Sequence, residues 1–134
     1  MKTRYLDHID LRVKNMARAR EFYRKVLPAL GFSRERAEQE WTTFYAPGRG
    51  RPEAFFGITE DRDHQPNGTR ISFWADDRAE VDRVAALVRE IGGQKLEGPE
   101  LCVEYVPGYY AFFFEDPDGN KLEICSRENP VVTE

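Results

Sequence analysis

A segment that occurs twice in the chain constrains the fold more than any other feature of the sequence. Residues 8–31 and residues 70–93 follow the same pattern at an offset of 62 residues. Each copy starts with alternating apolar and polar residues, which is typical of a strand with one buried face. Each then continues, after a polar N-cap residue (Asn15 or Asp77), as an amphipathic helical pattern that ends at glycine. The repeat therefore predicts two copies of one strand–helix unit.

Three short strands are expected after each helix. The apolar alternation and the intervening Gly and Pro residues place them at residues 32–36, 42–46 and 54–59 in the first copy and at 94–97, 111–115 and 121–126 in the second. A tight turn at Asp116-Pro117-Asp118-Gly119 precedes the last strand. The predicted order is β-α-β-β-β twice. The first module covers about residues 5–60 and the second about residues 69–126, with a linker at 61–68 and about eight extra residues within 98–110.

The two modules are expected to form one α+β domain over residues 1–134. A module of this size alone buries too little of its surface to be stable, so we expect the two sheets to pair as a half-barrel around a concave pocket. Side chains on a strand alternate between its two faces. Because the apolar positions should pack under the helices, the opposite parity directs these side chains toward the pocket: His8, Arg70, Ser72, Trp74, Phe113, Glu123 and Cys125.

Composition and charge exclude several classes of function. The chain has 134 residues, 40% of them apolar, and a formal net charge of −4, so it has enough apolar residues for a core but lacks the basic excess of a nucleic-acid-binding protein. No apolar run is long enough to span a bilayer, and the first residues lack the apolar stretch of a secretory signal. We therefore expect a cytoplasmic protein that binds neither nucleic acid nor membranes. Cys102 and Cys125 are too few for a disulfide scaffold and are expected to be small core residues.

Several stretches resemble the vicinal oxygen chelate superfamily. They are His8 to Val13, Glu21-Phe22-Tyr23, Leu30-Gly31-Phe32 and the run from Phe114 to Glu123, of which Asp-Pro-Asp-Gly-Asn-Lys-Leu-Glu is the most specific part. This group includes glyoxalase I, extradiol dioxygenases, fosfomycin-resistance transferases and metal-free bleomycin-resistance proteins. The resemblance covers about residues 5–126 and implies a glyoxalase-like domain with paired βαβββ modules around an open pocket. It does not imply one reaction, because this fold carries many chemistries.

The resemblance also implies a divalent metal site, with one departure. Metal-using members similar to this chain carry a histidine at the start of the first strand, a second histidine at the start of the matching strand in the other module, and a glutamate on the final strand. His8 and Glu123 match the first and third positions, which implies that they bind zinc, nickel, manganese or iron and that Glu123 is catalytic. Arg70 occupies the second position, and its protonated guanidinium offers no lone pair to a metal. Glu53 is a further ligand candidate, since it precedes Glu123 by the 70 residues that relate the later parts of the modules.

Alternatives to metal binding stay open for each of these residues. A histidine that starts a strand more often has a structural role, and this applies to His8. With the second histidine replaced, a bidentate ion pair between Arg70 and Glu123 would fill the position of the metal. The sequence alone does not choose between these arrangements.

Two functions from different classes are compatible with the sequence. The first is a metal-dependent lyase, isomerase or dioxygenase-type enzyme with a degenerate metal site. The second is a metal-free binding or resistance-type protein in which Arg70 recognises an anionic ligand. In both, we expect a small molecule with an apolar body to bind against aromatic walls that include Trp74, Tyr110 and Phe113. The apolar surface exceeds what one pocket needs, so we also expect a homodimer.

Overall fold

The computed structural model of the chain describes residues 5–48 and 50–127, which fall into two compact units. The boundary between them lies between Gln65 and Pro66, inside the linker predicted at residues 61–68. Each unit contains one helix and one four-stranded sheet, so the predicted α+β fold with two tandem β-α-β-β-β modules is confirmed. None of the described helices has the length and the hydropathy that crossing a membrane requires.

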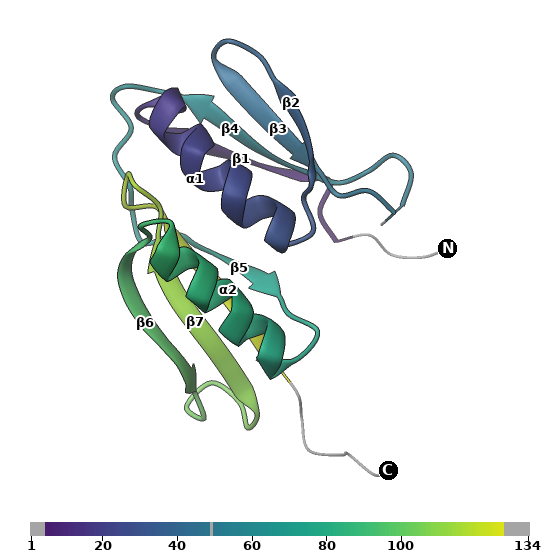
Figure 1. Cartoon of the computed structure of the whole chain (residues 1–134), viewed down its shortest axis with the longest axis vertical. Helices are drawn as coiled ribbons and strands as arrows, with labels where there is room; N and C mark the ends of the chain where they lie inside the picture. The colour runs from purple at the N-terminus through teal and green to yellow at the C-terminus, as the bar shows by residue number, and fades with distance from the viewer. Residues whose placement is uncertain (1–4, 49, 128–134) are drawn as a thin grey trace. The chain divides into compact units, whose positions relative to one another are not determined.

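The first unit is a mixed sheet with one helix packed on it (Figure 1). Its elements are β1 (His8–Val13), α1 (Met16–Ala29), β2 (Arg34–Ala37), β3 (Trp41–Tyr45) and β4 (Phe55–Glu60). The strand order is β1-β4-β3-β2, in which β1 is parallel to β4 and the other neighbours are antiparallel. Since α1 contacts β3 and β4, this helix covers one face of the sheet.

The second unit repeats this arrangement (Figure 1). Its elements are β5 (Arg70–Trp74), α2 (Arg78–Glu90), β6 (Gln94–Leu101), β7 (Tyr109–Glu115) and β8 (Lys121–Arg127). The strand order is β5-β8-β7-β6, again with the first pair parallel and the others antiparallel. The helix α2 contacts β6, β7 and β8 and covers one face. The repeat in the sequence is therefore a repeat of topology.

Both helices begin at the predicted caps. The side chains of Asn15 and Asp77 accept hydrogen bonds from the backbone N–H three residues on, at 2.9 and 2.8 Å. These bonds satisfy N–H groups that have no partner within the first turn of a helix. Just after each helix comes a glycine with positive φ, 96° at Gly31 and 85° at Gly92, as the sequence predicts. Local signals alone thus place both helices.

The core of each unit lies between its helix and its sheet. In the second unit, the buried stripe of α2 packs against alternate residues of β7 and β8, and these side chains are at most 2% exposed: Val81, Val84, Ala85, Val88, Phe112, Phe114, Leu122 and Ile124. Full burial of one such large apolar side chain stabilises the fold by about 1.5–3 kcal/mol. This packing also fixes which residues of the strands point away from the helix.

Two strands of the second unit are longer than predicted. The strand β6 continues to Leu101 and β7 begins at Tyr109, whereas the sequence predicted residues 94–97 and 111–115. The pairing of β6 with β7 passes through two shifts of register, before and after Glu97. Such irregularities interrupt the apolar alternation that marks a strand in the sequence. The predicted insertion at 98–110 is therefore partly strand, and the loop shortens to residues 102–108.

Candidate functional site

The second sheet carries a mixed polar and aromatic surface on the side opposite α2. The residues of this surface alternate with those that pack under the helix, as the sequence predicts. We call it the site face and define it by Arg70, Ser72 and Trp74 of β5, Tyr109, Ala111 and Phe113 of β7, and Glu123 and Cys125 of β8. Three neighbouring strands thus bring together most of the predicted site residues.

Glu123 is a buried carboxylate held by a tyrosine. The residue is 5% exposed, and its Oε2 accepts a hydrogen bond from the Tyr109 hydroxyl at 2.5 Å. Burial raises the pKa of Tyr109 above its ordinary value, and the hydrogen bond to Glu123 and the neighbouring Cys125 raise it further. Tyr109 is therefore protonated at neutral pH, and its proton is directed to the carboxylate.

Arg70 places its guanidinium over the ring of Phe113. The Cζ atom lies 4.8 Å from the ring centroid, a cation–π distance, and Nη1 donates to the backbone carbonyl of Leu122 at 3.5 Å. Glu123 pairs with Ser72 of β5, two residues after Arg70, and its carboxylate accepts a hydrogen bond from Tyr109. Among the described residues, Arg70 has no carboxylate partner, and the Arg70–Glu123 ion pair considered from the sequence does not form.

A hollow of about 270 Å³ opens at one end of the site face. It is lined by Ser72, Phe73, Trp74, Tyr109, Cys125 and Arg127. The guanidinium of Arg127 lies 4.7 Å from the ring centroid of Trp74, and the Ser72 hydroxyl donates to Cys125 Sγ at 3.4 Å. This volume is at the low end of ligand sites, so the hollow suits a small group.

The two cysteines are free thiols at the floor of the site face. Cys102 and Cys125 are 2% and 7% exposed and pack with Ala111. Burial raises the pKa of the Cys102 thiol, and nearby glutamates, first Glu104, raise it further. A thiol with a raised pKa is a poor nucleophile, which agrees with the expected role of small core residues.

Tyr110 does not share a face with Phe113, contrary to its assignment to the pocket wall. Its hydroxyl donates to Asp82 of α2 at 2.6 Å, so the ring lies on the helix side of the sheet. The physical reason is the period-2 alternation of β7, which begins at Tyr109 and directs Tyr109 and Tyr110 to opposite faces. The aromatic residue that lines the site face is therefore Tyr109.

His8 belongs to the first unit, whereas Arg70, Trp74, Phe113 and Glu123 belong to the second. Its ring stacks on Phe55 with centroids 4.4 Å apart and planes 3° from parallel. Nδ1 lies 2.6 Å from an oxygen of the neighbouring aspartate, and Nε2 has no partner among the described residues. One ring nitrogen of His8 is therefore available to a ligand.

Glu53 is not the counterpart of Glu123. The pairing of parallel strands places Gly57 of β4 at the position that Glu123 holds in β8. The offset of 70 residues relates β3 to β7 but falls to 66 residues for the last strands, because the first unit has a longer connection there. Glu53 itself precedes β4 and forms an ion pair with Arg34. The alignment that suggested Glu53 as a further metal ligand is therefore wrong.

The donor atoms of the second unit do not fit a metal centre. In the part of the chain that the structure describes, no group of three or more His, Cys, Asp or Glu side chains is arranged to hold a metal ion. Among the residues that define the site face, Glu123 is the one carboxylate, and Tyr109 donates to one of its oxygens. Arg70 adds an obstacle, because a positive charge about 4 Å from a divalent ion costs about 8 kcal/mol at an effective dielectric constant near 20.

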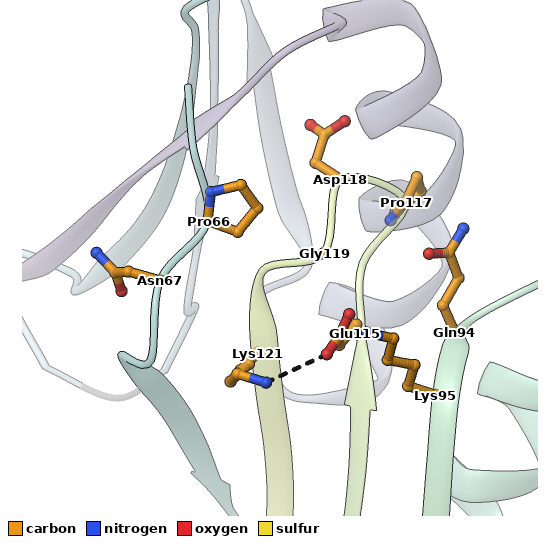
Figure 2. Close-up of a pocket in the computed structure, with 9 residues that line it drawn as sticks. All are labelled: Pro66, Asn67, Gln94, Lys95, Glu115, Pro117, Asp118, Gly119 and Lys121. Atoms are coloured by element: carbon orange, nitrogen blue, oxygen red, sulfur yellow. Dashed lines mark hydrogen bonds and ion pairs between the residues drawn. The ribbon is translucent and has the colours of Figure 1, made fainter. Parts of the chain in front are cut away.

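A larger hollow of about 480 Å³ lies at the turn between β7 and β8 (Figure 2). Its lining is Pro66, Asn67, Gln94, Lys95, Glu115, Pro117, Asp118, Gly119 and Lys121. Figure 2 shows Lys121 directed to Glu115, and the two charged groups are 3.3 Å apart. None of the predicted site residues lines this hollow, and an internal ion pair already uses two of its charges. The site face is therefore the stronger candidate.

The sequence does not single out Tyr109 or Arg127 as lining residues of the site. Tyr109 lies in the insertion predicted at residues 98–110, where no strand parity assigns it to a face. Arg127 follows the last strand predicted at residues 121–126, but it is the last residue of β8 and lies over Trp74. Residues 109–114 are all apolar or aromatic, so no alternation in the sequence marks their faces; the start of β7 at Tyr109 places this residue on the face of Ala111 and Phe113.

Comparisons with known proteins identify similar chains. A family model described as Glyoxalase/Bleomycin resistance protein/Dioxygenase superfamily matches residues 5–124. A glyoxalase/bleomycin resistance protein from Albidiferax ferrireducens T118 has a TM-score of 0.72 and 26% identity, over 91% of this chain and 98% of that chain. The fosfomycin resistance protein FosX from Mesorhizobium loti has a TM-score of 0.68 and 19% identity, over 93% of each chain.

A further similar structure contains ligands. It is a variant of FosX from Listeria monocytogenes, complexed with Mn(II) and 1S,2S-dihydroxypropylphosphonic acid. It has a TM-score of 0.67 and 19% identity, over 92% of this chain and 90% of that chain. The comparison with curated protein sequences found no match.

Proposed function

The chain belongs to the glyoxalase/bleomycin resistance protein/dioxygenase superfamily, and we propose that it binds a small organic anion on the site face, with Arg70 as the group that recognises the anion. The observation that carries the proposal is the guanidinium of Arg70, which lies over Phe113 without a carboxylate partner among the described residues. A guanidinium presents planar N–H donors that match carboxylates and phosphonates bidentately. Arg70 thus offers an oriented positive charge at the position where metal-using members similar to this chain carry a metal-binding histidine.

The rest of the site face suits the apolar body of such a ligand. Ala111 and Phe113 form an apolar floor, and Trp74 is 68% exposed beside it. Covering apolar surface contributes roughly 25 cal/mol for each Å² removed from water. An anion with an aromatic or aliphatic body is therefore held by one charged contact and a larger apolar one.

One similar structure with a bound organic ligand supports an anionic ligand. The FosX variant from Listeria monocytogenes is complexed with a phosphonic acid, which is a small anion. At 19% identity this likeness concerns the fold, so it supports the class of ligand and not its identity. The arginine at position 70 is the feature of this chain that fits that class.

The donor set favours binding without a resident metal. Glu123 is engaged by Tyr109, and Arg70 replaces a nitrogen ligand with a permanent cation. A metal-dependent enzyme is the second candidate, favoured by the available Nε2 of His8 and by the Mn(II) of the FosX variant. In that case His8 and Glu123 would hold a divalent ion, which would polarise oxygen atoms of the substrate.

Isothermal titration with small anions tests the proposal. The probes are phenylacetate, 3-phenylpropionate and phenylphosphonate, added to the wild type and to Arg70→Ala and Arg70→Lys. We expect Arg70→Ala to weaken binding at least about tenfold and Arg70→Lys to recover part of the loss, because lysine keeps the charge but not the planar donors. The control is Arg83→Ala, which removes the same charge from the exposed side of α2. Equal affinities in the wild type and Arg70→Ala would contradict the proposal.

Elemental analysis separates the two candidates. The protein is purified without chelators, and its metal content is compared with that of His8→Ala. Far less than one metal ion per chain in the wild type, even after incubation with Mn²⁺, Ni²⁺, Zn²⁺ or Fe²⁺, agrees with metal-free binding. A stoichiometric metal that is lost in His8→Ala would instead establish the metal-dependent candidate.

A further inference from the structure

The two hydroxyl groups beside the hollow act as hydrogen-bond donors to neighbouring side chains. The Tyr109 hydroxyl donates to Glu123 at 2.5 Å, and the Ser72 hydroxyl donates to Cys125 Sγ at 3.4 Å. A hydroxyl has one proton and two lone pairs, so in this arrangement each oxygen can accept a further hydrogen bond. Both residues line the hollow. A ligand group that donates a hydrogen bond therefore fits the hollow without rotating either hydroxyl.

The third polar group of the hollow has the opposite character. Arg127 lines it with a permanent positive charge, and its guanidinium carries donors and no acceptor. An ammonium group would satisfy the two hydroxyl oxygens but would be repelled by this cation. A neutral hydroxyl matches both kinds of partner, because it donates to Ser72 or Tyr109 and accepts from Arg127.

We propose that the anion recognised by Arg70 is a hydroxylated one, whose hydroxyl group occupies the hollow lined by Ser72, Tyr109 and Arg127. This inference rests on the proposed function, which it deepens by naming the class of ligand. The ligand is a hydroxy-carboxylate or a hydroxy-phosphonate with an apolar part between its two polar ends. Ammonium-bearing analogues and analogues without the hydroxyl bind more weakly.

The strand geometry limits the length of the ligand. Ser72 and Trp74 lie two and four residues beyond Arg70 on β5. At about 3.3 Å per residue, the hollow is displaced along the strand from Arg70 by roughly 7–13 Å. Between the two ends, Phe113 and Ala111 provide an apolar floor. The volume of about 270 Å³ admits the end of a small ring or chain.

Three matched probes test the inference. They are 3-(4-hydroxyphenyl)propionate, 3-phenylpropionate and 3-[4-(aminomethyl)phenyl]propionate, which share the carboxylate and the ring and differ at the far end. The chain contains two tryptophans, so Trp41→Phe leaves Trp74 as the sole indole, and its fluorescence reports on the hollow. In this background we expect the hydroxyl probe to bind about tenfold more tightly than either analogue.

Two variants test whether the tighter binding of the hydroxyl probe arises from contacts in the hollow. We expect Ser72→Ala and Arg127→Gln each to reduce that advantage, measured as the ratio of the affinities for the hydroxyl probe and for 3-phenylpropionate, severalfold. Ser33→Ala, which removes an exposed hydroxyl from the first unit, should leave all affinities unchanged. Equal affinity for the three probes, or an advantage that survives both Ser72→Ala and Arg127→Gln, would overturn the inference.

Arg70→Ala distinguishes this inference from the function on which it rests. If the proposed function holds, the variant weakens the three probes by the same factor. If Arg70→Ala weakens them all but no probe is preferred, the hydroxyl assignment alone fails. If Arg70→Ala has no effect on any probe, the proposed function fails. Absence of binding to the wild type up to about 10 mM of each probe contradicts both.

Discussion

The Tyr109 hydroxyl on β7 donates to the buried carboxylate of Glu123 on β8, with 2.5 Å between the oxygens. Glu115, the other buried glutamate among the described residues of the second unit, has Lys121 as its partner at 3.3 Å. The Glu123 carboxylate thus accepts from a neutral group, while the Glu115 carboxylate at the end of β7 is paired with a cation. A buried polar group that loses its partner costs more than an exposed one, so this hydrogen bond has measurable consequences.

The first prediction concerns the stability contributed by that bond. We expect Tyr109→Phe to lower the free energy of unfolding by about 1–3 kcal/mol, because the buried carboxylate of Glu123 loses its donor. Tyr110→Phe is the matched control, since its hydroxyl also donates to a carboxylate, that of the exposed Asp82, and we expect a loss below about 1 kcal/mol. Urea denaturation at neutral pH measures both. Equal losses of unfolding free energy in the two variants would contradict a larger contribution from the buried Tyr109–Glu123 hydrogen bond.

A second prediction follows from the pKa of Tyr109, which burial and Glu123 raise in the folded state. The unfolded chain loses this proton near pH 10, and the folded chain only at higher pH. The stability gained from the raised pKa is therefore fully present below about pH 10 and decreases as the pH rises further, by up to about 1.4 kcal/mol per pH unit. Urea denaturation between about pH 8 and about pH 11 should give a shallower decrease for Tyr109→Phe than for the wild type. Parallel curves would contradict this.

A third prediction concerns the turn between β7 and β8. Asp116 is fully buried, and its carboxylate accepts from the backbone N–H groups of Asp118 and Asn120 and from the Asn120 side chain, at 2.8–2.9 Å. We expect Asp116→Ala to lower the free energy of unfolding by about 2–4 kcal/mol, because three hydrogen-bond donors lose a charged acceptor. Asp61→Ala removes a comparable but exposed turn contact to Asp63 and should cost below about 1 kcal/mol. Thermal unfolding of both variants measures the difference.

A fourth prediction separates two glycines by their surroundings. Gly98 has a φ of 92°, and an added Cβ would lie 2.8 Å from the backbone oxygen of Ala111, so we expect Gly98→Ala to destabilise the second unit by at least about 2 kcal/mol. Gly68 has open space around it and no positive φ, so Gly68→Ala should be neutral or slightly stabilising. Hydrogen exchange of β6 and β7 amides locates the effect. A stable Gly98→Ala variant would be contrary to this geometry.

The sequence predicts the elements of the fold because their signals are local. The N-cap side chains of Asn15 and Asp77 bond within their own first turns, and the glycines after each helix adopt positive φ without a tertiary contact. The strands were harder to delimit at β6, where two shifts of register break the alternation around Glu97. The extent of that strand depends on its pairing with β7 and is not encoded in its own apolar pattern.

The residues of the candidate site could likewise be predicted only in part from the sequence. Alternation along β5 and β8 correctly placed Arg70 and Glu123 on one face, since the side-chain period of a strand is fixed by its backbone. Tyr110 was wrongly placed on the pocket wall, because the sequence predicts a loop where β7 begins and gives no face for it. The assignment of Glu53 rested on a constant offset of 70 residues, and it is wrong because the offset changes before the last strand, so Gly57 takes the position equivalent to Glu123.

The sequence by itself determined the two β-α-β-β-β modules, their order and the faces of the β5 and β8 residues, because periods of 2 and 3.6 residues and the caps act over a few neighbouring residues. Only the tertiary structure decided which side chains meet across the strands. Tyr109 bonds to Glu123, and Arg70 crosses to Phe113 of β7, because the register of three strands and the lean of long side chains place them there. Such contacts join residues distant in the chain, and no local pattern specifies them.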